Sequence, residues 1–143
     1  MSVRIGFAYN QKPSLPAPKK AGDSAAPAPA PALDKAPANR ALRPDLHQPD
    51  LYAEWDEPET IEAVAAALSG LGEVVRLEAD KDFPRRLLAA KVDFVFNIAE
   101  GLYGVNRESH VPSICEFLGI PYHASDPLSL ALTLHKGRAK EIM

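Results

Sequence analysis

Residues 92–98 read Val-Asp-Phe-Val-Phe-Asn-Ile, a run that is apolar at nearly every position. This pattern is typical of a strand in a parallel sheet, because helices cover both faces of such a strand. Short segments rich in β-branched and aromatic side chains at residues 3–9, 73–77 and 120–124 predict further strands. The run at 92–98 is the strongest of these signals and favours a parallel sheet.

Helical patterns separate the expected strands. A proline-led helix start at residues 56–59 precedes apolar residues at helical spacing as far as Leu68, and glycines follow. Residues 83–90 and 111–118 predict two more helices, and Ser-Asp-Pro at 125–127 begins a last one. Because strands and helices alternate, we expect an α/β fold, with a small open parallel sheet of about four strands and helices on both faces.

One stretch interrupts this alternation. The chain has 143 residues, enough for one domain, and most of its 14 prolines lie between residues 13 and 49. Residues 11–50 are rich in Pro and Ala and predict a disordered insertion between the first strand, 1–10, and the rest of the domain, 51–125. The alternative for the insertion is a docking arm for a proline-recognising partner. Residues 126–143 are expected to be a helix, whose uncapped end indicates the front piece of a longer protein.

Composition and motifs exclude several function classes. A net charge of −3 argues against a nucleic-acid binder, whose phosphate-binding face makes a chain basic. The single cysteine, Cys115, excludes a disulfide framework and a zinc–thiolate cluster, and it suits a reducing compartment. No apolar run approaches the ~18 residues of a membrane span, so we expect a cytoplasmic protein without membrane contacts. The histidines lack metal-ligand spacing, and dinucleotide-binding and Walker-type glycine loops are absent.

The expected ligand site lies at the carboxyl ends of the strands, where open parallel sheets bind ligands. The loop after residue 98 is the most informative, because Glu100 leaves a buried strand and Arg107 opens the next helix. In a functional interpretation Glu100 accepts a hydrogen bond from an ammonium group and Arg107 holds an anion. Structural alternatives remain: Glu108 suits the positive end of a helix dipole, and Arg107 can pair with Glu100 or Glu108.

An ordered set of motifs resembles a known family. The set consists of Asn-x-x-Glu-Gly at 97–101, Arg-Glu at 107–108, Leu-Gly-Ile-Pro-Tyr at 118–122 and a leucine-rich helix that reaches Lys136. It is similar to the N-terminal region of the D-alanine–D-alanine ligase and ligase-like branch of the ATP-grasp enzymes. The resemblance implies a Rossmann-like preATP-grasp domain that holds one side of an amino-acid substrate site. It also implies ATP and Mg²⁺ as cofactors, held mainly by ATP-grasp domains that would follow residues 126–143.

The same resemblance implies an activity and a set of site residues. The activity is that of an ATP-dependent carboxylate–amine ligase that forms a peptide-like bond through an acyl phosphate, in peptidoglycan precursor synthesis. Glu100 stands where typical ligases have a histidine, Arg107 and Glu108 take the place of a Glu-Asp pair, and Lys136 matches a lysine that contacts ATP phosphates. We therefore expect Glu100 and Arg107 to be catalytic and Lys136 to contact the cofactor. The expected substrate-binding residues are Tyr9, Asn10, Glu100, Gly101, Tyr103, Glu108 and Ser125.

Two departures from the family pattern point away from D-alanine itself as the substrate. Typical ligases follow the first strand with a Gly-Gly-x-Ser-x-Glu loop, whereas this chain has Ala-Tyr-Asn at residues 8–10. Glu100 also replaces a histidine with an anion. We expect this segment alone to be inactive, with an amino-acid substrate and a homodimer as partners of the complete protein. Two alternatives remain, namely a stand-alone α/β module that binds a zwitterion without catalysis and a scaffold tethered through the insertion.

Overall fold

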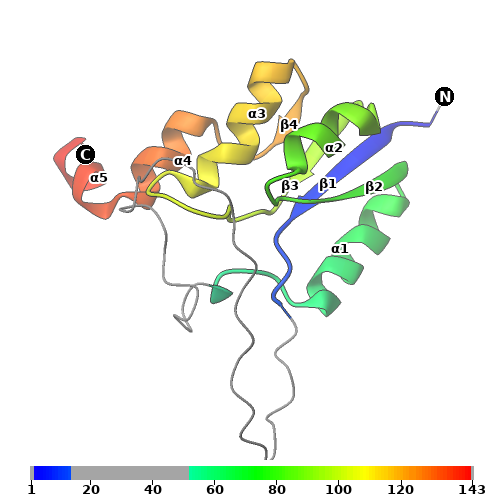
Figure 1. Cartoon of the computed structure of the whole chain (residues 1–143), viewed down its shortest axis with the longest axis horizontal. Coiled ribbons are helices and arrows are strands. Elements are labelled where there is room, and N and C mark those ends of the chain that lie inside the picture. The colour runs from blue at the N-terminus through cyan, green and yellow to red at the C-terminus, as the bar shows by residue number, and fades with distance from the viewer. Residues whose placement is uncertain (1, 14–51, 143) are drawn as a thin grey trace, which may run out of the picture.

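The computed structural model describes residues 2–13 and 52–142, which form a layered α/β domain (Figure 1). The sheet is open and parallel with strand order β2-β1-β3-β4, so the expected fold class is confirmed. The elements are β1 (Arg4–Tyr9), α1 (Pro58–Ser69), β2 (Glu73–Glu78), α2 (Phe83–Ala90), β3 (Phe94–Asn97), the 3₁₀ turn η3 (Arg107–Ser109), α3 (His110–Leu118), β4 (Tyr122–His123), α4 (Pro127–Leu134) and α5 (Lys136–Ile142).

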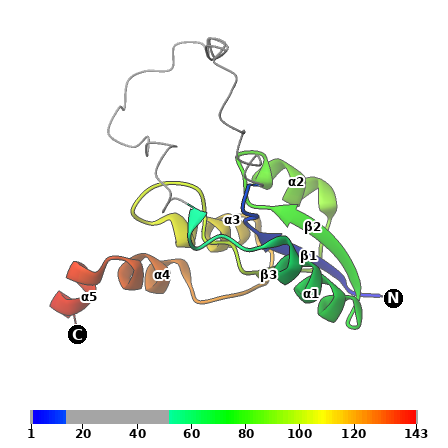
Figure 2. The same ribbon diagram turned by 90° about the horizontal axis from the view of Figure 1, so that it is seen from below.

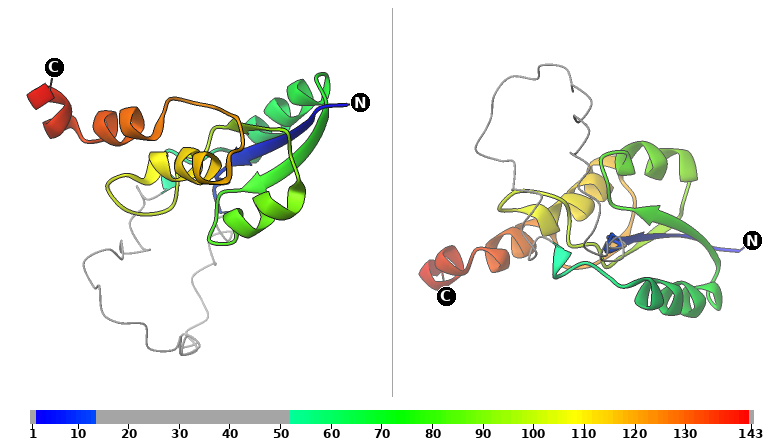
Figure 3. Two further views of the ribbon diagram at one scale, coloured as in Figure 1. Left: turned by 90° about the horizontal axis from the view of Figure 1, so that it is seen from above. Right: turned by 60° about the horizontal axis from the view of Figure 1, so that its bottom comes forward.

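Helices cover both faces of the sheet, as Figures 1 and 3 show. On one face, Ile61, Ala65 and Leu68 of α1 pack against Ile5 and Phe7 of β1. On the other face, α2 and α3 enclose a second apolar cluster. That cluster consists of Ala8, Leu77, Ala79, Phe83, Leu87, Val95, Ala99, Val111 and Cys115. Successive residues of β1 thus face opposite layers, which is the period-two alternation of a strand buried on both sides.

The order of the strands reverses between β1 and β3. The chain runs from β1 outward to β2, then crosses back over β1 to β3 and continues outward to β4. Crossover connections on opposite sides leave a crevice where the two loops diverge, at the carboxyl ends of β1 and β3. The residues that leave those two strands, Asn10 and the segment 98–101, therefore lie at the position where this fold class binds ligands.

Two strands are shorter than the sequence pattern predicts. The paired part of β3 covers four residues, although the Asp93 amide donates to the Arg4 carbonyl and the Ile98 amide donates to the Ala8 carbonyl at its two ends. The expected strand at 120–124 has only two paired residues, Tyr122 and His123. Pro121 precedes them, accepts a hydrogen bond through its carbonyl, and has no amide hydrogen to donate to the ladder.

The segment 126–143, expected as a single helix, contains two helices within its described part. Asp126 caps α4 as the sequence predicts, because its Oδ1 accepts from the Ser129 amide at 3.0 Å. At His135 the backbone leaves the helical region, with φ −93° and ψ 84°. The imidazole Nδ1 of His135 then accepts from the Arg138 amide at 3.3 Å, so this side chain caps the start of α5. A histidine in the role of a helix cap has no distinctive sequence signal.

Most of the expected insertion, residues 14–50, lies outside the described residues, as does residue 51, but residues 11–13 and the segment from residue 52 onward are described. Gln11 forms a parallel bridge to Asp56, and the Asp56 amide donates to the Asn10 carbonyl at 2.8 Å. Lys12 extends this contact through its amide to the Asp56 carbonyl and through its ammonium group to Glu57, each within 2.9 Å. The chain therefore leaves and re-enters the domain at one place, and residues 11–12 belong to the folded domain and not to the insertion.

Two further observations concern the single cysteine and the length of the helices. Cys115 is fully buried on α3, and burial raises the pKa of its thiol to about 11, which keeps it an uncharged core residue. Within residues 2–13 and 52–142, every helix is too short or too polar to cross a bilayer.

Candidate functional site

Asn10 joins the carboxyl ends of three strands. Its side chain is almost completely buried, with 1% exposed. The side-chain amide donates to the Ala79 carbonyl at 3.1 Å, and Oδ1 accepts from the Gly101 amide at 2.8 Å. Ala79 follows β2 and Gly101 follows β3, so one side chain fixes the loops after β1, β2 and β3 relative to one another. Sequence reasoning placed Asn10 in the substrate site, whereas the structure gives its polar atoms internal partners.

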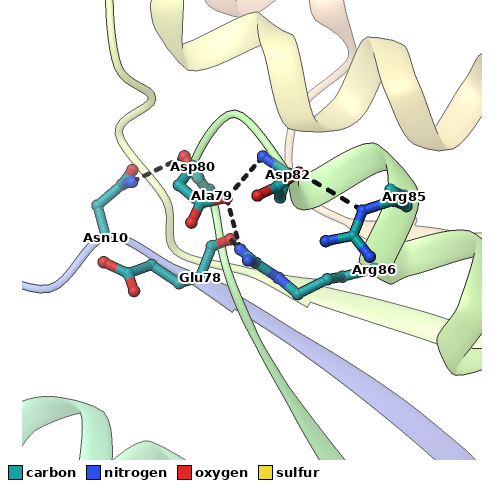
Figure 4. Close-up of polar contacts among 7 residues, drawn as sticks. All are labelled: Asn10, Glu78, Ala79, Asp80, Asp82, Arg85 and Arg86. Carbon is teal, nitrogen blue, oxygen red and sulfur yellow. Dashed lines mark hydrogen bonds and ion pairs between the residues drawn. The ribbon is translucent and has the colours of Figure 1, made fainter.

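Hydrogen bonds connect the residues of the loop between β2 and α2, which lies beside Asn10 (Figure 4). Arg86 donates to the Glu78 carbonyl and to Oδ1 of Asp80, both at 2.6 Å, and the Asp82 amide donates to the same Asp80 oxygen at 2.8 Å. Burial opposes ionisation of Asp80, yet these hydrogen bonds outweigh it and hold the pKa of Asp80 below its usual range. The Asp80 carboxylate is therefore engaged in holding the loop.

Glu100 and Glu108 line a small pocket beyond the carboxyl end of β3. The pocket has a volume of about 150 Å³, and its walls are Asn97, Ile98, Ala99, Glu100, Glu108, Ala124 and Leu130. Glu100 comes from the loop after β3 and Glu108 from η3, whereas Leu130 comes from α4. The structure thus brings together two of the acidic residues that the sequence placed in the site.

Arg107 lies near Glu108 but binds a residue that the sequence did not predict. Its guanidinium forms an ion pair with Glu54, on the segment that re-enters the domain before α1, and approaches Glu108 at 4.0 Å. Carboxylate oxygens of Glu54, Glu100 and Glu108 all lie within 4.8 Å of one another. Of the two pairings that the sequence left open for Arg107, the described residues show the approach to Glu108 and no ion pair or hydrogen bond to Glu100. Arg107 turns to Glu54 instead.

The surroundings of Glu100 disfavour its ionised form. Burial is the largest cause, the neighbouring carboxylates of Glu108 and Glu54 add to it, and Arg107 partly offsets it, so the pKa of Glu100 is raised. A cationic ligand group beside Glu100 would reverse this balance, because an opposite charge favours the ionised carboxylate. An ammonium group in this pocket would therefore be stabilised by the carboxylates of Glu100 and Glu108.

Glycine at position 101 lets the loop close tightly onto η3. Gly101 has φ +79°, and a Cβ atom there would lie 2.2 Å from the Arg107 carbonyl oxygen. Only glycine combines that conformation with so close an approach of two backbone segments. The loop between these residues therefore returns on itself, and this return places Arg107 next to Glu100 although the two are seven positions apart in the sequence.

Lys136 shares a neighbouring cleft with Arg107. This cleft has a volume of about 370 Å³ and is lined by Val105, Arg107, Leu134, His135, Lys136 and Gly137. The break between α4 and α5 at His135 turns the chain so that Lys136 faces the loop that carries Arg107. Two cations at one cleft match the chemistry of a phosphate or carboxylate ligand.

The remaining predicted residues lie apart from the acidic pocket. The ring of Tyr9 packs against that of Phe7 on the α1 face, with 5.2 Å between the ring centroids. Burial is the main cause that raises the pKa of Tyr9, and the Glu78 carboxylate adds to it. Tyr103 is 37% exposed in the loop, and Ser125 is exposed just before the cap of α4. Gly101 lines a different cavity, between the loop and α2. None of these four contributes to the described walls of the pocket that holds Glu100 and Glu108.

Sequence reasoning missed Glu54, because its approach to Arg107 depends on how the chain returns from residues 14–51. The local sequence, Tyr-Ala-Glu-Trp at 52–55, indicates an aromatic packing anchor and gives no sign of a site residue. The rings of Tyr52 and Trp55 do pack edge to face, with 4.7 Å between their centroids. Their turn presents Glu54, which lies between them in sequence, to Arg107.

Comparisons with known proteins agree with the family resemblance. The D-alanine–D-alanine ligase of Aquifex aeolicus is 41% identical over 86 residues, which is 59% of this chain and 29% of that enzyme. The D-alanine–D-alanine ligase of Ruegeria pomeroyi is 45% identical over 78 residues, 54% of this chain and 25% of the enzyme. The "Uncharacterized protein y4sG" of Sinorhizobium fredii is 37% identical over 98 residues, 62% of this chain and 29% of that protein. No family model and no solved structure matches the chain.

The matches are partial in length. The chain spans only 25–29% of the length of these relatives. By sequence, this chain is a relative of the D-alanine–D-alanine ligases.

Proposed function

We propose that this domain binds the amino-acid substrate of an ATP-dependent carboxylate–amine ligase of the D-alanine–D-alanine ligase type. In that reaction a substrate carboxylate takes the γ-phosphoryl group of ATP and becomes an acyl phosphate. The amine of a second substrate then attacks the acyl carbon, loses a proton and displaces phosphate, which leaves a peptide-like bond. We further propose that the product serves peptidoglycan precursor synthesis.

The observation that carries this proposal is the convergence of Glu100, Arg107 and Glu108 at the reversal of strand order. A zwitterionic amino acid needs an acceptor for its ammonium group and a cation for its carboxylate. Glu100 and Glu108 supply the acceptors at the pocket wall, and Arg107 supplies the cation 4.0 Å from Glu108. Support also comes from the ligase relatives, which are 41% and 45% identical over the matched residues.

The residues of this domain fit only one part of the cofactor set. Lys136 and Arg107 share a cleft whose charge suits phosphate oxygens, so we assign Lys136 a contact to ATP. Magnesium prefers carboxylate oxygens. The guanidinium of Arg107, however, pairs with Glu54 and lies 4.0 Å from Glu108, and its positive charge opposes a metal ion there. We therefore place Mg²⁺ and most of the nucleotide in other domains of the protein.

The proposal is tested first by ligand binding to the chain itself. Backbone amide signals of residues 97–101 and 107–109 are followed by NMR during titration with D- and L-amino acids. We expect shifts for at least one amino acid in the wild type and much weaker binding in Glu100→Gln. Glu116→Gln, on the exposed side of α3, is the matched control and should bind like the wild type. Equal binding in wild type and Glu100→Gln would contradict the assignment of the pocket.

Catalysis is tested in the protein that also carries the ATP-grasp domains. We expect ADP release that depends on amino acids, and Glu100→Gln should lower turnover about 100-fold or more, the size expected when a charged positioning contact is lost. The 143-residue chain alone should release no phosphate from ATP with any D-amino acid. Turnover of Glu100→Gln within twofold of the wild type would make the carboxylate a structural residue only. Amino-acid binding without any ADP release would favour the stand-alone binding module.

A further inference from the structure

Arg107 is the cation that the proposed function assigns to a substrate carboxylate, yet a carboxylate of the chain itself is bound to it. Glu54 forms this ion pair, with its side chain 60% exposed, whereas that of Arg107 is 27% exposed. The pair joins segments far apart in sequence. Figure 2 shows the segment that begins at residue 52 beside the loop that precedes η3.

The turn that carries Glu54 has few other attachments to the domain. Within residues 52–55, the Trp55 amide donates to the Tyr52 carbonyl at 3.1 Å, and the two rings pack on each other. Among the described residues, the Glu54–Arg107 pair is the polar contact of this turn with the rest of the domain. The firm anchor comes one residue later, where Asp56 pairs with the segment 10–12. The turn can thus move about Asp56 if the single ion pair breaks.

The position of Glu54 changes the charge of the site in two ways. While it is bound, Arg107 is occupied and three carboxylates lie within 4.8 Å of one another, so a ligand anion meets both a blocked cation and like charges. When Glu54 moves away, Arg107 is free and one negative charge leaves. The site then offers one cation beside Glu100 and Glu108, which matches a zwitterion.

We propose that Glu54 is a built-in competitor for Arg107, a carboxylate of the chain that a ligand carboxylate must displace before it can bind. The inference rests on the proposed role of Arg107 as the anion holder. It adds a residue that lies outside the family motifs of this chain and assigns a function to the turn at residues 52–55. A ligand that carries an ammonium group and a carboxylate gains both contacts, whereas a simple anion gains only the second.

The experiment measures anion binding at Arg107 in the full chain. The Nε–Hε signal of Arg107, assigned by its absence in Arg107→Lys, is followed by NMR during titration with sodium acetate and, separately, with glycine at constant ionic strength. In Glu54→Gln we expect both ligands to bind about two- to fivefold more tightly than in the wild type, the range of one exposed ion pair. Glycine should bind more tightly than acetate in both proteins.

Glu57→Gln is the matched control, because it removes an equal charge three residues away and breaks only the ion pair with Lys12. It should leave both affinities unchanged. If Glu54→Gln binds acetate and glycine no better than Glu57→Gln does, Glu54 does not compete for Arg107 and the inference fails, while the proposed function stands. If neither ligand shifts the Arg107 signal in any variant, Arg107 is not an anion holder, and both the inference and that part of the proposed function fail.

Discussion

Asn10 shows how one buried polar side chain determines the geometry of a candidate site that it does not line. Both of its polar atoms are hydrogen-bonded, to the Ala79 carbonyl and to the Gly101 amide. The Gly101 amide belongs to the loop that carries Glu100, so the position of that carboxylate depends on Asn10. A substitution at residue 10 therefore affects both the stability of the fold and the placement of the site.

Asn10→Ala should lower the free energy of unfolding by about 2–4 kcal/mol, because a buried donor and a buried acceptor each lose a partner. Urea denaturation of wild type and variant measures this change. Asn106→Ala is the control, since Asn106 is exposed and its side chain makes no hydrogen bond within the described residues. The control should stay within about 0.5 kcal/mol of the wild type. If Asn10→Ala lowers the free energy of unfolding no more than the control does, water replaces the two hydrogen bonds of the Asn10 side chain.

Glu100→Gln should make the empty domain more stable near neutral pH. The pKa of Glu100 is raised in the fold, so the native state prefers the protonated carboxyl group, and ionisation lowers stability as pH rises through that raised pKa. Below the pKa of an unfolded glutamate the effect is absent, because the group is protonated in both states. Thermal unfolding at pH 7 and pH 4 should show a higher Tm for Glu100→Gln at pH 7 and a smaller difference at pH 4.

Glu78→Gln, on the exposed side of β2, serves as the control for loss of one negative charge. Its effect on Tm should be smaller than that of Glu100→Gln at pH 7. A Tm for Glu100→Gln that is below the wild-type value at pH 7 would show that the carboxylate has a stabilising partner in solution, contrary to the geometry described.

At the scale of elements, the loop between β3 and η3 depends on two glycines with different surroundings. Gly101 and Gly104 both have positive φ, +79° and +90°. A Cβ at Gly101 would lie 2.2 Å from the Arg107 carbonyl oxygen, whereas a Cβ at Gly104 would meet nothing within 4 Å. A substitution at Gly104 therefore introduces backbone strain alone, whereas one at Gly101 adds a steric overlap with η3.

Gly104→Ala should lower the free energy of unfolding by about 1–2 kcal/mol, the strain of a left-handed alanine. Gly101→Ala should have at least twice that effect, because the loop must also move away from η3. Urea denaturation measures both variants, and the Arg107 Nε–Hε signal should shift only in Gly101→Ala. Equal losses in the two variants would mean that the contact between the loop and η3 relaxes easily.

At the scale of the whole molecule, residues 14–51 connect two segments, 10–12 and 56–57, that contact each other directly. Gln11 bridges to Asp56, and Lys12 binds Glu57, so the two flanks are held together by contacts of their own. The cost of closing a flexible loop grows slowly with its length, at roughly 0.6 kcal/mol per doubling. The fold should therefore not require a long connection here.

Replacement of residues 14–51 by a short glycine–serine linker should preserve the fold and raise the free energy of unfolding by roughly 1–2 kcal/mol, because fewer unfolded conformations are lost. Chemical denaturation and the pattern of backbone amide signals measure the outcome. A linker of the same composition and the original length is the control, and it should unfold like the wild type. A loss above about 2 kcal/mol in either protein would show that residues 14–51 pack on the domain.

The sequence alone determined the elements and their class, because these depend on local periodicity. The apolar run at 92–98 predicted the central strand β3, and Asp126-Pro127 predicted the start of α4, whose cap bonds within three residues. The place of the candidate site also followed from the sequence, since an alternating strand–helix pattern puts ligands at the carboxyl ends of the strands. The break at His135 escaped prediction because both sides of it have helical composition.

Only the tertiary structure decided which side chains meet at that site. Asn10 and Glu100 looked alike as polar residues after strands, but a buried amide bonded on both sides holds loops together, whereas a half-buried carboxylate without a hydrogen bond faces the pocket. Arg107 could pair with Glu100 or Glu108 by sequence. It binds Glu54 because the chain re-enters the domain beside η3, and a contact between residues 53 positions apart depends on the path of the chain, which no local pattern contains.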